Sequence, residues 1–221
     1  MPLRRRERPT TIAGMSAATP QLPAGYEEFT VFDRRTHALN RRISYILHFA
    51  AVIFFVPLFA AVTAAVRPGH PLDPVDLWAV SIPGLGIVGA VAIMFFAVVA
   101  VLYLHEFVHA AALRFVVGAK PKISGRRLGI SVSSPRWYLP KTSMLANAVL
   151  PFFSISALGA AVMAVVPPQG IAWIFIPLVA NGVASARDVI TVSWVLASPK
   201  RALFLDEGNA LSVYAPAERS D

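Results

Sequence analysis

The chain has 221 residues, of which 56% are hydrophobic and only 14% are charged. This composition excludes an ordinary water-soluble domain and is typical of a protein that crosses a membrane several times. The formal net charge is +8, but the basic residues gather beside apolar runs, where they determine membrane topology, so we expect no nucleic-acid partner. The absence of cysteine excludes disulfides and thiolate ligands, and leaves histidines and carboxylates for any metal site.

The N-terminal segment, residues 1–21, is expected to be disordered. It is basic at its start and then rich in proline, alanine and threonine, and no apolar stretch follows soon enough for a cleavable signal peptide. We expect residues 22–215 to form a single membrane-embedded domain and residues 216–221 to be a C-terminal tail.

Four apolar segments are long enough to span a bilayer, which requires roughly 20 helical residues. They are residues 43–66, 78–117, 144–166 and 171–197. The second is much longer than one span needs, and its early Pro83-Gly84 pair predicts a short interfacial start, a break and then one long helix. The sequence therefore predicts an all-α polytopic membrane protein with about four transmembrane helices.

Positive charge is unevenly distributed among the connections between these segments. The stretch before the first segment contains eight arginines and four acidic residues, and residues 118–143 contain six basic residues and no acidic one. The other two connections together contain one arginine and no lysine. By the positive-inside rule, we expect a multi-pass protein of the cell membrane with both termini and the central loop in the cytoplasm.

Short β-hairpin elements are expected on this cytoplasmic side. The central loop contains GISVSS (residues 129–134) and RWYLP (residues 136–140), which fit either a β-ribbon or a plain basic loop at the lipid headgroups. Residues 202–214 alternate apolar and polar side chains around an Asp-Glu-Gly-Asn turn. This second pattern predicts a hairpin near the C-terminus.

The string His105-Glu106-Phe107-Val108-His109 lies near the end of the long second segment. Residues four apart share one face of a helix, so His105 and His109 can bind one metal ion while Glu106 acts on a water molecule. This is the H-E-x-x-H pattern of zinc hydrolases. The alternative is a helix end whose polar groups meet headgroups or pair with each other. Because three ionisable groups inside a membrane are costly, we favour the metal site.

A catalytic zinc ion usually takes three protein ligands and keeps a fourth position for water. Apart from the motif, Asp188 is the only carboxylate inside a predicted span. Its distance in residues from the cytoplasmic helix end is similar to those of the two histidines, so all three side chains are expected at a similar depth. We therefore expect a single zinc ion bound by His105, His109 and Asp188.

Several other polar residues have more than one interpretation. Asp188 could instead pair with Arg187 or Arg114, although adjacent helical residues point about 100° apart. Asn147 and Asn181 could orient a ligand or hydrogen-bond a substrate carbonyl, but we favour a role in helix packing for both. The remaining histidines are expected to be ordinary interfacial residues: His37, His48 and His70.

Four stretches resemble a family of membrane proteins described as "Putative zincin peptidase". They are LPAGYEEFTVFD, HEFVHAAALRF, the AVLPF element at residues 148–152, and NGVASARDVITVSWVLASPKRALFLDEG. The resemblance covers residues from about 22 to 215, so the domain is expected to be zincin-like. More distantly, the chain is similar to the site-2 proteases, which are intramembrane zinc enzymes with H-E-x-x-H on one helix and a later aspartate on another.

The resemblance implies peptide-bond hydrolysis within or beside the membrane, with Glu106 as the base and a membrane protein or peptide as the substrate. Two departures from the site-2 proteases point to a different substrate or to a partner that presents it. Val189, and not glycine, follows Asp188, and no PDZ-like domain is evident. A zinc transporter or sensor, or an inactive membrane scaffold, is the alternative function.

Overall fold

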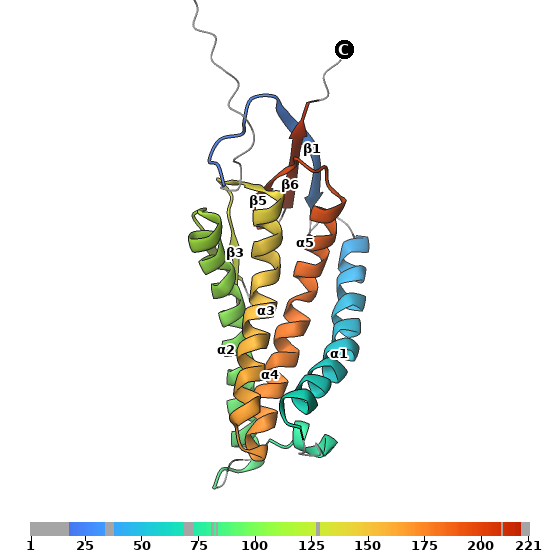
Figure 1. The fold of residues 1–221 in the computed structure, drawn as a ribbon, viewed down its shortest axis with the longest axis vertical. Helices are drawn as coiled ribbons and strands as arrows, with labels where there is room; N and C mark the ends of the chain where they lie inside the picture. The colour runs from blue at the N-terminus through green and yellow to red at the C-terminus, as the bar shows by residue number, and fades with distance from the viewer. Residues whose placement is uncertain are drawn as a thin grey trace, which may run out of the picture.

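The computed structural model describes residues 18–33, 38–68, 73–80, 82, 84–126, 129–208 and 210–217. Residues 1–17 of the segment predicted to be disordered, and Pro83 of the predicted break, lie outside these ranges. The described chain is a bundle of helices with a β-sheet at one end and a further strand, β3, alongside the helices (Figure 1).

The helices account for most of the chain. They are α1 (Ala38–Val66), η1 (Pro74–Leu77), α2 (Ile87–Ala111), its π-helical continuation η2 (Ala112–Val117), α3 (Lys141–Val165), η3 (Pro168–Gly170), α4 (Ile171–Ala184) and α5 (Ala186–Ala197). Among the described residues, four helical segments are long and apolar enough to cross a membrane. They overlap the four predicted segments, and the long helix of the second begins at Ile87, after the Gly84 of the predicted break. The short helical turn η1 lies before the second predicted segment and not within it.

α4 lies at the centre of the bundle, in contact with α1, α2 and α3. Two glycines allow close approach. A Cβ atom on Gly159 would lie 2.5 Å from the Leu178 side chain of α4, and one on Gly182 would lie 2.5 Å from the Phe55 ring of α1. The outer faces of α1 and α2 expose many large apolar side chains. A surface of this kind is expected to contact lipid, because it would be unfavourable in water.

The fourth predicted segment is divided into two helices at Ser185. The Ser185 hydroxyl donates to the Asn181 carbonyl oxygen at 2.9 Å, and the Ser185 carbonyl oxygen accepts from the backbone N–H groups of both Asp188 and Val189 at 3.0 Å. A serine hydroxyl that bonds back to the preceding turn bends a helix. The bend places Asp188 in the first turn of α5.

One antiparallel sheet joins the two ends of the chain. Its strand order is β1 (Tyr26–Asp33), β6 (Ala210–Pro216), β5 (Leu203–Asp206) and β4 (Tyr138–Pro140). The β5–β6 pair confirms the predicted C-terminal hairpin, and its buried side chains pack with the end of η2. The pairing of β1 with β6 was not predicted, and it places the segments before α1 and after α5 at the same end of the bundle (Figure 1).

The central loop forms strands and not a plain loop. β2 (Lys122–Arg126) and β3 (Gly129–Ser133) make a two-stranded antiparallel ribbon, and β3 packs against α2. The two segments identified in the sequence are therefore both strands, but they belong to different sheets, because β4 pairs with β5. A turn closed by the Trp137 N–H and the Ser134 carbonyl oxygen separates β3 from β4.

Candidate metal centre

α2 presents both motif histidines on its inward face. His105 is 3% exposed and His109 is 9% exposed, whereas Phe107 between them is 52% exposed. This alternation follows from the helical repeat, because residues four apart point in the same direction and the intervening residue does not. The two imidazole ring centroids lie 5.0 Å apart.

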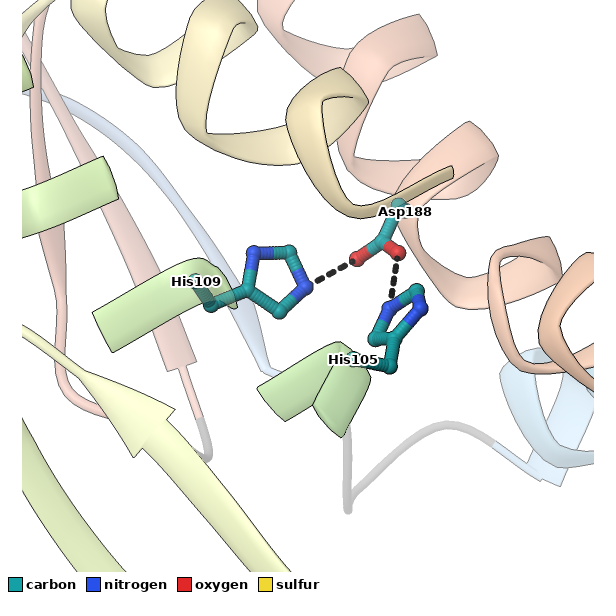
Figure 2. Close-up of side chains that lie close together, drawn as sticks. All are labelled: His105, His109 and Asp188. Carbon is teal, nitrogen blue, oxygen red and sulfur yellow. Dashed lines mark hydrogen bonds and ion pairs between the residues drawn. The ribbon is translucent and has the colours of Figure 1, made fainter. Parts of the chain in front are cut away.

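The side chain of Asp188 reaches both imidazoles from α5. The distance from His105 Nε2 to Asp188 Oδ2 is 3.0 Å, and that from His109 Nε2 to Asp188 Oδ1 is 3.4 Å. Figure 2 shows the two rings pointing toward the two oxygens of one carboxylate. The fold thus brings together the three residues selected from the sequence, and one potential ligand atom from each lies within 4.8 Å of the others.

The remaining ring nitrogens are held by hydrogen bonds on the far side. His109 Nδ1–H donates to the backbone carbonyl oxygen of Asn147 at 2.9 Å, and His105 Nδ1–H donates to Asn181 Oδ1 at 2.9 Å. Since a carbonyl oxygen only accepts, the His109 proton must be on Nδ1. A neutral imidazole protonated at Nδ1 carries its lone pair on Nε2, which is the atom that faces Asp188.

The donor set fits a zinc ion. Two imidazole nitrogens and a carboxylate oxygen direct lone pairs to one point, an arrangement that requires protons or a cation between them. Two histidines with one acidic residue are ligands that catalytic zinc takes, and each histidine has the outer hydrogen bond that usually fixes such a ligand. The cluster is therefore compatible with zinc binding.

Glu106 lies beside the cluster and is tied to the β-ribbon. Its Oε2 atom accepts a hydrogen bond from the Val132 backbone N–H of β3 at 3.0 Å. This contact could not be predicted from the sequence, because it depends on how the ribbon folds back along α2.

A cavity of about 650 Å³ joins these groups. Near the cluster it is lined by His105, Glu106, His109 and Asp188, together with Asn147 and residues 130–132 of β3. It is also lined by apolar side chains of α1, α2 and α4, including Val52, Leu102 and Val179. The cavity therefore has both polar and apolar lining residues.

Some residues have a different environment from the one expected. Asn181, for which the sequence favours a role in helix packing, is completely buried and also hydrogen-bonds to His105. Asn147 contacts His109 through its backbone and lines the cavity. His48, expected to be an ordinary interfacial residue, also lines the cavity. His37 and His70 lie outside the described residues.

The comparisons with known proteins concern the segment that builds this cluster. No curated protein and no solved structure matches the chain. A family model does match, and the matched residues include the motif on α2, Asn147 on α3 and Asp188 on α5. The predicted resemblance is thereby confirmed over residues 98–203, which match the protein family described as "Putative zincin peptidase".

Proposed function

We propose that this protein is an intramembrane zinc metallopeptidase, similar in type to the site-2 proteases, that hydrolyses peptide bonds of membrane-associated substrates. The observation that carries the proposal is the convergence of His105, His109 and Asp188, from two helical segments able to cross a membrane, in a segment that matches a peptidase family. One zinc ion would be held by these three side chains. Metallopeptidases of this ligand type need one further residue, a base, and Glu106 lines the same cavity.

In the proposed reaction, the zinc ion and the side chains of the protein have different roles. When bound, zinc supplies Lewis acidity, which polarises the scissile carbonyl and lowers the pKa of the attacking water. Glu106 accepts a proton from that water and returns it to the leaving amine. The acceptors behind His105 and His109 keep both Nε2 atoms directed at the cluster, so little reorganisation is needed before reaction.

The edge of β3 supports an extended conformation of the substrate. A helical substrate must unwind before cleavage, since its amide groups are already paired. In an antiparallel ribbon, alternate residues direct their N–H and C=O groups away from the partner strand. The Val132 N–H points to Glu106 and not to β2, so Val132 and Ile130 face away from β2, and both line the cavity. A substrate strand can pair with this edge beside Glu106.

The pairing of β1 with β6 supports the proposed topology. The segments joined in this sheet precede α1 and follow α5, so they lie on one side if four segments cross the membrane. The basic central loop and N-terminal segment favour the cytoplasm for that side. We therefore place the protein in the cell membrane with both termini cytoplasmic, and tags at the two ends should be accessible only from the cytoplasmic side.

The substitution Glu106→Gln tests the function directly. The expected result is zinc bound as in the wild type and hydrolysis lost, measured by metal analysis of the purified protein and by new N-termini in the membrane proteome. His105→Ala is the control that should lose zinc. Hydrolysis unchanged in Glu106→Gln would refute the peptidase assignment and favour a zinc transporter or sensor, because neither needs this base.

The substitution Ile130→Pro tests the pairing edge. It removes an N–H group on the free edge of β3 and none in the β2–β3 ladder, so the ribbon should persist. We expect slower cleavage with unchanged zinc content, and near-normal cleavage in the control Ile130→Ala. Equal cleavage by the two variants would exclude pairing of the substrate at this position.

A further inference from the structure

Asn147 of α3 carries a buried polar group that the hydrogen bonds of the fold do not satisfy. The residue is 8% exposed and lines the cavity beside His105, Glu106 and His109. Its backbone carbonyl oxygen is engaged by His109 Nδ1–H. Its side-chain Oδ1 has no hydrogen-bond partner within the part of the chain that the structure describes.

An unpartnered buried oxygen is costly in the interior of a protein. In a cavity wall beside reactive groups, the cost can be offset by a ligand that supplies the missing partner. A carboxamide has an acceptor oxygen and a donor NH₂ group, which match the N–H and the C=O of a peptide bond. The side chain of Asn147 is therefore complementary to polypeptide backbone.

The position of Asn147 fits this partner. Its backbone contacts the ring of His109, so its side chain is held close to the metal cluster. The edge of β3 lines the same cavity. An extended substrate chain in the cavity could thus meet both the backbone groups of β3 and the carboxamide of Asn147.

We infer that Asn147 is a substrate-binding residue whose carboxamide hydrogen-bonds the backbone peptide group next to the scissile bond. The inference rests on the proposed peptidase function and adds a specific contact to it. It assigns to Asn147 two separate tasks: the backbone carbonyl orients His109, and the side chain holds the substrate.

The substitution Asn147→Ala separates the two tasks, because it removes the side chain and keeps the carbonyl. Ser156→Ala is the matched control, since Ser156 is also on α3 and its Oγ is also buried without a partner in the described chain, but it does not line the cavity. The probe is an N-blocked leucyl-leucine hydroxamate, whose binding to purified zinc-loaded protein is measured by calorimetry. This measurement requires no hydrolysis.

We expect Asn147→Ala to bind zinc as the wild type does and to bind the hydroxamate about two- to tenfold more weakly, as for the loss of one hydrogen bond. Ser156→Ala should bind both normally. Loss of zinc in Asn147→Ala, equal weakening in Ser156→Ala, unchanged hydroxamate affinity, or no binding by the wild type would each overturn the inference.

The activity assay distinguishes this inference from the proposed function. Cleavage lost in Glu106→Gln but fully retained in Asn147→Ala would overturn the role of Asn147 alone. Cleavage unchanged in both variants would overturn the peptidase function, and the substrate-binding role with it.

Discussion

Replacement of Asn181 with alanine should weaken zinc binding without removing a ligand. The substitution deletes the acceptor that lies 2.9 Å from His105 Nδ1. Because Asn181 is 0% exposed, bulk water does not readily replace that acceptor, and the imidazole N–H is left buried without a partner. Such a loss costs about 1–3 kcal/mol.

That free energy can be converted into an affinity. We assume that the lost hydrogen bond destabilises the zinc-bound state, in which the orientation of His105 matters. Each 1.4 kcal/mol of this destabilisation then raises the dissociation constant of zinc about tenfold. The expected loss of affinity is therefore about 5- to 150-fold, which includes the range of about 10- to 100-fold found when outer hydrogen-bond partners of metal ligands are removed. The measurement is a competition titration of zinc against a fluorescent chelator with the purified protein in detergent.

Asn147→Ala is the matched comparison for Asn181→Ala. Both histidine ligands have an asparagine behind them, but His109 bonds to the backbone of its asparagine, which alanine retains. Zinc affinity should therefore fall in Asn181→Ala and change by less than about twofold in Asn147→Ala. In Asn181→Asp, which keeps an acceptor, affinity should largely return. Wild-type affinity in Asn181→Ala, or an equal loss in both alanine variants, would refute this account of ligand orientation.

Three further predictions concern stability, measured by thermal unfolding in detergent. Gly182→Ala should lower the free energy of unfolding by about 1–3 kcal/mol, because its Cβ would lie 2.5 Å from the Phe55 ring. Gly125→Ala, where nothing lies within 4 Å, is its control, and equal melting of the two variants would mean that the ring moves aside freely. Lys141→Met should lower the free energy of unfolding by about 1–2 kcal/mol, since the Lys141 ammonium donates at 3.0 and 2.8 Å to two carbonyl oxygens at the end of α5. An unchanged melting temperature would mean that these two hydrogen bonds do not stabilise the fold. Free zinc at about 100 times its dissociation constant should raise the stability by about 2.7 kcal/mol, and the same increase in His105→Ala would place the ion elsewhere.

The sequence predicted the features that depend on local pattern. Hydropathy and length located the four apolar helices, because lipid contact requires long apolar stretches. The spacing of His105 and His109 predicted their common face, and the shared depth of Asp188 predicted that it could reach them. These inferences needed only the helical repeat and the direction of each segment.

Contacts between distant segments were less accessible from the sequence. β4 is only three residues long, and its pairing with β5 is set by the positions of the ends of α3 and α5. The hydrogen bond from Val132 to Glu106 depends on the path of the ribbon along α2. The roles of Asn147 and Asn181 differ in whether backbone or side chain faces the imidazole, and residue spacing alone does not specify that difference.

The sheet that unites β1 with β6 has a consequence for the order of assembly during translation. β1 is synthesised before any of the long helices, but its partner is the last strand, and the Tyr26 hydroxyl bonds to a carbonyl oxygen 175 positions later. Asp188 is also made late, in the last helix before that hairpin. A ribosome-bound chain therefore lacks Asp188 until α5 has been synthesised, and it cannot close this sheet until β6 has been synthesised. If the apolar helices enter a membrane in chain order, as the proposed topology implies, the first three would do so before the cluster of His105, His109 and Asp188 can form.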